Sequence, residues 1–188
     1  MKKLALTILT LTLASAATPA LAENFSVTAG GMGNIYVVDA RPELDPGVGG
    51  YFAFDYRWAP ELSTTFSVVV TTQNGTGISA GNNNILVFGI PTVDFKYYPI
   101  PEATYFDPFL LGGVGFYLVS DGSGGNGTQA AGMGAQAGVG CDFYFTQKLS
   151  FQFMGIFRSI ALIDGISGTN NGTAIFPFSL QGGLSYHF

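Results

Sequence analysis

Six charged residues of this chain have the spacing of an interior ion-pair network. They are Asp55, Arg57, Asp94, Lys96, Asp142 and Arg158. Asp55 precedes Arg57 by two positions, and Asp94 precedes Lys96 by two, so in a β-strand each pair points to one side. Opposite charges packed in a narrow space neutralise each other and satisfy their hydrogen bonds. The pattern therefore predicts a structural lumen charge network, and a path for ions or protons is the alternative.

Residues for catalysis or metal binding are scarce. The sole histidine, His187, stands one residue from the end of the chain and has no obvious partner with which to activate a serine. No Cys/His cluster or carboxylate-rich loop has the spacing of a metal site. Cys141 is the only cysteine, so no intramolecular disulfide forms. The sequence predicts a protein that is not an enzyme, with no metal and no cofactor.

Alternating strands must position these side chains. Residues 173–188 alternate between an apolar set ending at Phe188 and a mostly polar set, which indicates a strand with lipid on one side and a polar lumen on the other. The same period recurs along the chain. The predicted strands are residues 24–35, 48–58, 62–71, 85–98, 109–119, 132–145, 149–158 and 173–188. The segment 109–119 is apolar on both sides, so its inward face is left unassigned.

Connections between the strands alternate in length. Three are short, at residues 59–61, 99–104 and 146–148. Four are longer and rich in Gly, Asn and Asp, at residues 39–46, 72–83, 121–128 and 164–171. Short turns at one end and long loops at the other are typical of an outer-membrane barrel. Together these features predict an all-β fold, an eight-stranded antiparallel up-and-down transmembrane β-barrel.

Composition agrees with this prediction. Charged residues make up only 10% of the chain and aromatic residues 14%, whereas a soluble domain has roughly 25% charged residues. Lys2, Lys3, a short apolar run and Ala20-Leu21-Ala22 predict a signal peptide over residues 1–22 and a barrel domain over 23–188. Without the signal, 7 − 2 = 5 basic residues face 12 acidic ones, a net charge of −7. This balance argues against a nucleic-acid partner.

The chain resembles the small eight-stranded outer-membrane proteins, the group that includes the OmpA membrane domain, OmpX and OmpW. The resemblance is sharpest in the tail Gln181-Gly182-Gly183-Leu184-Ser185-Tyr186-His187-Phe188, which is similar to the assembly signal of that group. It implies that Gln181, Gly183, Tyr186 and Phe188 are read by the outer-membrane assembly machinery. It also implies a location in the outer membrane of a Gram-negative bacterium, in contact with membrane lipid and lipopolysaccharide.

An apolar upper lumen is predicted near the long loops. Its members are Met32, Tyr51, Val69, Leu86, Phe88, Ile90, Ile156 and Ile175. Packing among these side chains is one interpretation, and binding or passage of a small hydrophobic ligand, as the resemblance to OmpW implies, is the other. Surface adhesion through the extracellular loops is a third function left open. Eight strands leave an interior that side chains nearly fill, so the main expectation is a largely closed lumen and a structural role.

Overall fold

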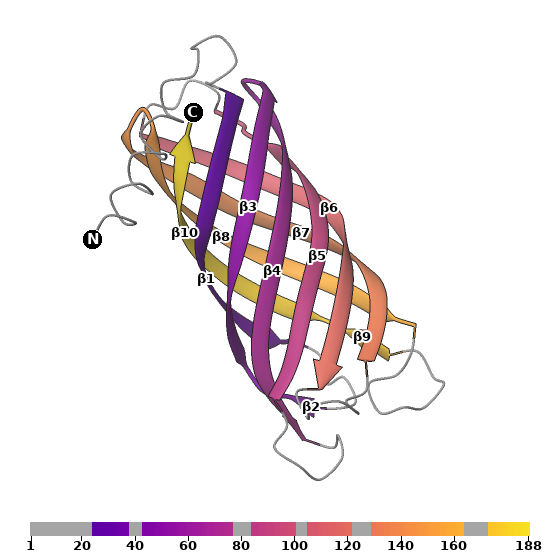
Figure 1. The fold of residues 1–188 in the computed structure, drawn as a ribbon. Helices are drawn as coiled ribbons and strands as arrows, with labels where there is room; N and C mark the ends of the chain where they lie inside the picture. The colour runs from indigo at the N-terminus through magenta and orange to yellow at the C-terminus, as the bar shows by residue number, and fades with distance from the viewer. Residues whose placement is uncertain (1–23, 38–42, 77–83, 101–104, 122–128, 164–172) are drawn as a thin grey trace, which may run out of the picture.

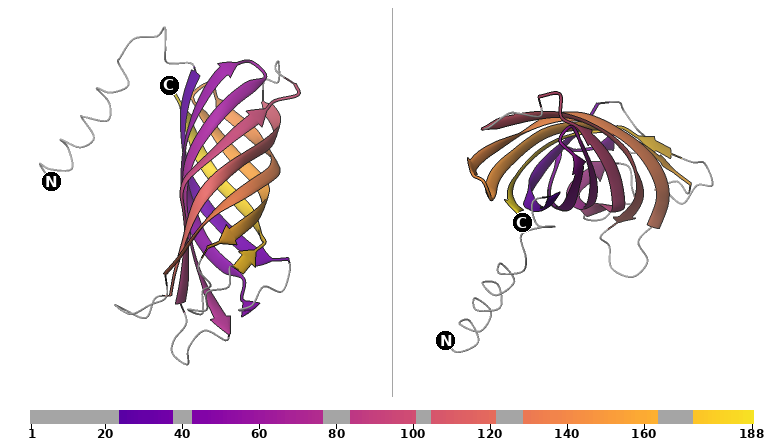
Figure 2. Two further views of the ribbon diagram at one scale, coloured as in Figure 1. Left: turned by 90° about the vertical axis from the view of Figure 1, so that its right-hand side faces the viewer. Right: turned by 90° about the horizontal axis from the view of Figure 1, so that it is seen from above.

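The predicted alternation is realised as antiparallel strands that close into a barrel (Figures 1 and 2). The computed structural model describes residues 24–37, 43–76, 84–100, 105–121, 129–163 and 173–188. The predicted signal peptide lies outside the described residues, as do large parts of the four predicted long loops. None of the described residues forms a helix of the length and apolarity that a membrane crossing requires.

Eight long strands make the wall. They are β1 (Phe25–Tyr36), β3 (Gly47–Ala59), β4 (Leu62–Thr76), β5 (Asn84–Tyr97), β6 (Phe106–Asp121), β7 (Gln129–Thr146), β8 (Leu149–Leu162) and β10 (Pro177–His187). Two short strands complete the sheet, β2 (Glu43–Leu44) beside β4 and β9 (Thr173–Ile175) beside β8. Each long strand pairs with its neighbour in the chain, and β10 pairs with both β8 and β1. The all-β, eight-stranded up-and-down fold is confirmed.

Closure brings the two ends of the barrel sequence together. β1 and β10 pair over eleven residues from Ser26–His187 to Tyr36–Pro177, and the Phe188 amide donates to the Phe25 carbonyl at 3.0 Å. In Figure 1 the start of β1 and the end of β10 lie at the same end of the cylinder. The short β3–β4 and β7–β8 links lie at this end, which we call the turn end. We call the opposite end the loop end.

Apolar side chains cover the outside of the wall. Phe52, Phe153 and Leu180 expose about half of their surface, at 54%, 46% and 50%. The strands carrying them alternate between exposed apolar residues and buried ones, as in the burial of every second residue along β8. Such an exterior suits hydrocarbon better than water. Charged and polar side chains are correspondingly turned toward the barrel axis.

β5 contains a bulge that the sequence analysis did not place. Between the pairs Ser67–Thr92 and Val69–Gly89, β4 has one residue and β5 has two, Ile90 and Pro91. β6 likewise has one residue opposite these two. An extra residue reverses which side chains face inward. The face predicted for β5 therefore holds from Thr92 onward and is inverted before Ile90.

Candidate functional site: the barrel lumen

All six residues of the predicted charge network project into the lumen. Five of them are almost fully buried, and Arg57, nearest the turn end, keeps 26% of its side chain exposed. They divide into two groups along the axis. Asp55, Arg57, Lys96 and Asp142 lie near the turn end, whereas Asp94 and Arg158 lie farther toward the middle of the barrel.

The group near the turn end is held by two ion pairs. Lys96 Nζ lies 2.8 Å from Asp55 Oδ1, and the Thr65 hydroxyl donates to the same carboxylate oxygen. Arg57 Nη1 lies 2.8 Å from Asp107 Oδ2. Asp107 was not predicted, because β6 is apolar on both faces and its phase could not be assigned. With Asp107 added, we define the turn-end cluster as Asp55, Arg57, Lys96, Asp107 and Asp142.

Aromatic rings pack against the cations of this cluster. The Arg57 guanidinium lies 4.0 Å from the centre of the Tyr98 ring, and Lys96 Nζ lies 4.9 Å from the centre of the Phe109 ring. Arg57 Nε also donates to the Pro60 carbonyl at 3.0 Å, which ties the cluster to the β3–β4 turn. Cation–π contacts of this kind stabilise a desolvated cation. The two rings thus fill the space beside the charged side chains at this end of the lumen.

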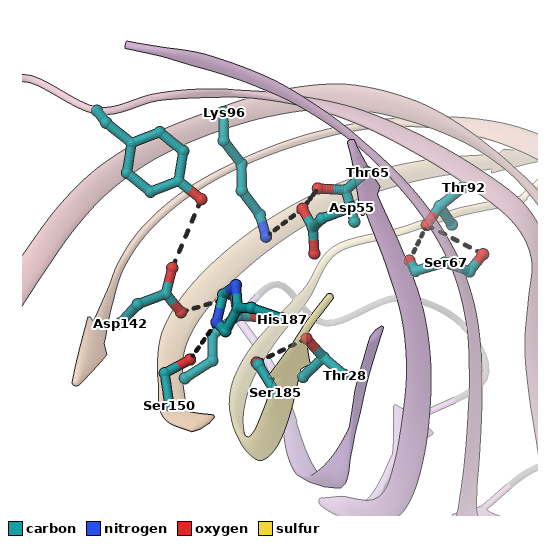
Figure 3. A network of polar contacts seen from close by, with 12 residues as sticks. Thr28, Asp55, Thr65, Ser67, Thr92, Lys96, Asp142, Ser150, Ser185 and His187 are labelled. Atoms are coloured by element: carbon teal, nitrogen blue, oxygen red, sulfur yellow. Dashed lines mark hydrogen bonds and ion pairs between the residues drawn. The ribbon is translucent and has the colours of Figure 1, made fainter. Parts of the chain in front are cut away.

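Asp142 is held by neutral groups instead of a cation. Gln152 Nε2 donates to its Oδ1 at 3.0 Å, and the Tyr98 hydroxyl donates to its Oδ2 over 3.5 Å. Burial raises the pKa of Tyr98, the first residue after β5, well above its ordinary value, so this hydroxyl keeps its proton. Among the described residues, no cation lies within 4.0 Å of the Asp142 carboxylate. Figure 3 shows Asp142 near the Lys96–Asp55 pair, with no hydrogen bond or ion pair drawn between them.

A second network crosses the middle of the lumen, and we call it the middle network. Its centre is Gln136, whose Nε2 donates to Asp94 Oδ1 at 2.5 Å and whose Oε1 accepts from Arg158 Nε at 2.9 Å. The Tyr117 hydroxyl donates to the same oxygen at 2.9 Å. Arg158 also donates to Ser179, which bonds Asn34. The contacts join six strands, β5, β6, β7, β8, β10 and β1.

Toward the loop end the lumen becomes mainly apolar, with a different set of residues from the one predicted. Met32, Tyr51, Val69, Ile156 and Ile175 are buried inside. Thr71 and Gln73 of β4 are also buried there, opposite Val87 and Ile85. The inward orientation predicted for Leu86, Phe88 and Ile90 is wrong, because the β5 bulge turns them outward; Ile90 is 43% exposed, and Ile85 and Val87 occupy the lumen instead. We define the loop-end lining as Ile85, Val87, Tyr117, Val119, Ala130, Ile160, Leu162 and Ile175.

Gly89, Gly115 and Gly134 make room for the Tyr117 ring of this lining. A side chain at Gly134 would meet the Tyr117 ring at 2.9 Å and Ile160 at 3.0 Å. The bare backbone therefore lets both side chains lie flat against the wall. Ile160 and Leu162 lie on the lumen face of β8, which is polar nearer the turn end. The alternation of buried and exposed residues continues through them without a break. They extend the apolar lining beyond the point at which the predicted strand ended.

A small cavity remains between the turn-end cluster and the middle network. It has a volume of about 10 Å³ and is lined by residues that include Tyr51, Lys96, Met154, Arg158 and Gln181. A cavity of this size holds about one water molecule. Eight strands with filled interiors leave little more space than this.

The predicted assembly residues divide between the two faces of β10. Gln181 and Gly183 face the lumen, and a side chain at Gly183 would meet the Tyr51 hydroxyl at 2.7 Å. Tyr186 and Phe188 lie on the outer surface. Their shared position at the turn end agrees with a strand edge that is read during insertion. That role remains a prediction.

His187 has a partner that the sequence did not indicate. Its Nε2 lies 2.9 Å from Ser150 Oγ, and its ring stacks on Tyr144 at 5.1 Å. Ser150 is fully buried, so its hydroxyl is closed to a substrate. The contact therefore packs the turn end of the lumen. Within the described ranges, no three His, Cys, Asp or Glu side chains are grouped as metal ligands would be.

Comparison with known proteins identifies the architecture through structure rather than sequence. No protein-family model and no curated protein matches the chain. Among solved structures, Neisserial surface protein A superposes with a TM-score of 0.62 at 14% identity, covering 87% of this chain and 97% of that one. OprG from Pseudomonas aeruginosa gives 0.58 at 15% identity, covering 89% and 97%.

A third similar structure is Ail, the attachment invasion locus protein of Yersinia pestis, in complex with the heparin analogue sucrose octasulfate. It gives a TM-score of 0.54 at 14% identity, covering 88% of this chain and 99% of that one. At such identities the likeness concerns the fold. It agrees with the predicted outer-membrane location, which the apolar exterior also supports. The chain has the fold of the small eight-stranded outer-membrane β-barrel proteins.

Proposed function

We propose that this protein is a non-enzymatic outer-membrane β-barrel with a closed lumen and a structural role in the membrane. The observation that carries the proposal is the middle network, in which Gln136 links Asp94 to Arg158 across the lumen. The turn-end cluster blocks the lumen a second time below it. The cavity beside these groups, about 10 Å³, is too small for a hydrated ion.

Two kinds of partner follow from this role. The apolar exterior faces lipid, and near the loop end it meets the lipopolysaccharide leaflet. The outer-membrane assembly machinery binds the β10 segment that carries Gln181, Gly183, Tyr186 and Phe188. Neither partner requires an open lumen.

A second candidate function is binding of a small hydrophobic molecule at the loop end. It is favoured by the loop-end lining, whose side chains are nearly all less than 3% exposed and mostly aliphatic. An apolar ligand entering there would replace contacts among these side chains. The middle network closes the lumen beneath such a ligand, so a ligand would not pass along the axis to the turn end.

Planar-bilayer recording tests the closed lumen, and native mass spectrometry of the same preparation tests the ligand. We expect the wild-type barrel to show no steady conductance. Because the turn-end cluster would still block a lumen without the middle network, the opened control removes side chains from both: Gln136→Ala and Arg158→Ala are combined with Asp55→Ala and Lys96→Ala. This variant should conduct small ions. Steady wild-type conductance equal to that of the control would overturn the closed lumen. An adduct co-purified with the wild type and lost in Val119→Asp would establish the second function.

A further inference from the structure

The two polar groups of the lumen differ in their charge balance. The middle network has one carboxylate, Asp94, and one cation, Arg158, so it is neutral. The turn-end cluster has the three carboxylates Asp55, Asp107 and Asp142 and two cations, Arg57 and Lys96, a sum of 2 − 3 = −1. Its members are mostly shielded from water, and only Arg57 keeps substantial exposure. One positive charge is therefore missing from a site of low polarity.

The imbalance falls on Asp142. Asp55 and Asp107 each have a cation at 2.8 Å, whereas Asp142 has only the Gln152 amide and the Tyr98 hydroxyl. Asp107 stands directly opposite Asp142 across the β6–β7 pairing, and Gln152 stands opposite it across β7–β8. Asp142 is only 3% exposed, so water does little to stabilise a charge there.

Other ionisable groups surround this carboxyl group. The charges that act on it come from Lys96, Asp55 and Asp107, on β5, β3 and β6. The phenols of Tyr51, Tyr98 and Tyr144 lie within electrostatic range of it. His187 on β10 lies within range of Asp55, Arg57 and Lys96 and closes the same end of the lumen (Figure 3). Two of the three nearest charges are negative, so the surroundings do not supply the missing cation.

The cluster also lacks hydrogen-bond donors. Asp55 Oδ2, Asp107 Oδ1 and Gln152 Oε1 are buried oxygens without a hydrogen-bond partner among the described residues. A carboxyl group that keeps its proton supplies one O–H donor. It also removes the unpaired charge, and a buried carboxylate without a cation generally takes up a proton in preference to remaining ionised. One proton thus balances the charge and supplies one of the missing donors.

We propose that the turn-end cluster is a proton-binding site and that Asp142 holds the proton in mildly acidic solution. The proton is exchanged through the turn end, where the Arg57 side chain is exposed. Releasing it leaves the cluster with its unbalanced negative charge. The packing that closes this end of the barrel therefore loosens as the pH rises. This property is additional to the closed lumen and does not require a ligand.

Infrared spectroscopy of the folded barrel in lipid bilayers tests the assignment directly. We expect a carboxylic-acid C=O band at pH 5 in the wild type that is lost in Asp142→Asn. Asn keeps the shape of the side chain, and its amide can still bond Gln152. The matched control is Asp94→Asn in the neutral middle network, which should retain the band. A wild-type barrel without the band, or an Asp142→Asn barrel that keeps it, would overturn the proposal.

Equilibrium unfolding gives a second, independent measure. An Asp carboxyl group in the unfolded chain titrates near pH 4, so the folded state binds one proton more than the unfolded state above that pH. Stability must then fall as the pH rises, and the wild-type unfolding constant should rise relative to Asp142→Asn by about tenfold per pH unit while the folded barrel holds its proton. Equal pH slopes for the two proteins would contradict the site.

Two further experiments test whether another source of positive charge, a bound cation or protonated His187, balances the cluster. If a bound cation balances the cluster, wild-type stability will rise with sodium chloride concentration, compared with choline chloride, and Asp142→Asn will abolish the difference. If protonated His187 balances it, His187→Gln will remove the pH dependence and Asp142→Asn will not. Either result would overturn the assignment to Asp142. We expect neither, and the His187→Gln barrel should keep the infrared band.

Discussion

The two ends of the lumen fill the same kind of space with opposite chemistry. The turn-end cluster fills it with ion pairs at 2.8 Å and with aromatic rings stacked on the cations. The loop-end lining fills it with aliphatic side chains such as Ile85, Ile160 and Ile175, which are at most 1% exposed. Both ends are tightly packed. They differ in what a lost side chain leaves behind.

A side chain lost from the turn end leaves a charge without its partner. A side chain lost from the loop end leaves an empty volume. An unpaired buried charge costs about 3–5 kcal/mol, and a cavity costs about 2–5 kcal/mol depending on how far its walls relax. The comparison thus predicts that turn-end damage is repaired by neutralising the second partner. Loop-end damage is repaired only by refilling the space.

The largest expected effect follows from removing Lys96. Lys96→Met keeps much of the side-chain volume but leaves Asp55 without its cation, so we expect a loss of about 3–5 kcal/mol of unfolding free energy. Urea titration of the barrel in lipid vesicles measures it. The double variant Lys96→Met, Asp55→Asn should recover most of the loss, because no unpaired charge remains. A double variant as unstable as the single one would show that Lys96 acts through packing alone.

A smaller effect is expected from Ile160 at the loop end. Ile160→Ala removes buried methyl groups that lie against Gly134 and should cost about 2–4 kcal/mol. The matched control is Ile163→Ala, just beyond β8 and 71% exposed, which should cost about 0.5 kcal/mol or less. The same urea titration compares them. Equal losses would mean that the loop end is loosely packed, and the contrast between the two ends would fail.

The sequence predicts one of these two regions better than the other, for a physical reason. Charged residues are rare in this chain, so Asp55, Arg57, Asp94 and Lys96 mark the inward face of their strands without ambiguity. At the loop end most residues on both faces of the wall are apolar, one face against lipid and one against the lumen, although Thr71 and Gln73 are buried inside. The polarity of a residue there does not indicate whether its side chain faces the lumen or the lipid. The face must then be assigned from the two-residue alternation of the strand alone. That assignment fails where a bulge inserts an extra residue.

β5 and β6 show how this period is lost. In β5 the extra residue at Ile90 and Pro91 reverses the face, and a proline in a strand signals a bulge without fixing which residues turn. In β6 the Gly- and Leu-rich run hides the phase altogether, which is why Asp107 was missed. The pairing of β6 with β7 places Asp107 opposite Asp142. Long-range pairing of this kind is visible only once the barrel is closed.

The smallest effect on stability is expected for a substitution at Phe88, which tests whether the β5 bulge turns this side chain outward. Phe88→Trp, in a Trp58→Phe background that removes the only other tryptophan, replaces one outward aromatic ring with another and should cost about 1 kcal/mol or less. Because Phe88 lies beyond the bulge and pairs with the exposed Leu118, its indole should face lipid. Lipids with brominated acyl chains should then quench its fluorescence strongly.

The matched lumen position for this test is Tyr117, which is 1% exposed and lies one residue before Leu118 on the neighbouring strand. Tyr117→Trp in the same background should be shielded from brominated lipid by the barrel wall. Quenching at position 88 as weak as at position 117 would restore the unbulged phase of β5. The loop end would then be lined by Leu86, Phe88 and Ile90. Ile85 and Val87 would in that case face lipid. The lining of the loop end would consist of larger side chains, and the comparison with the turn end would have to be made with those residues.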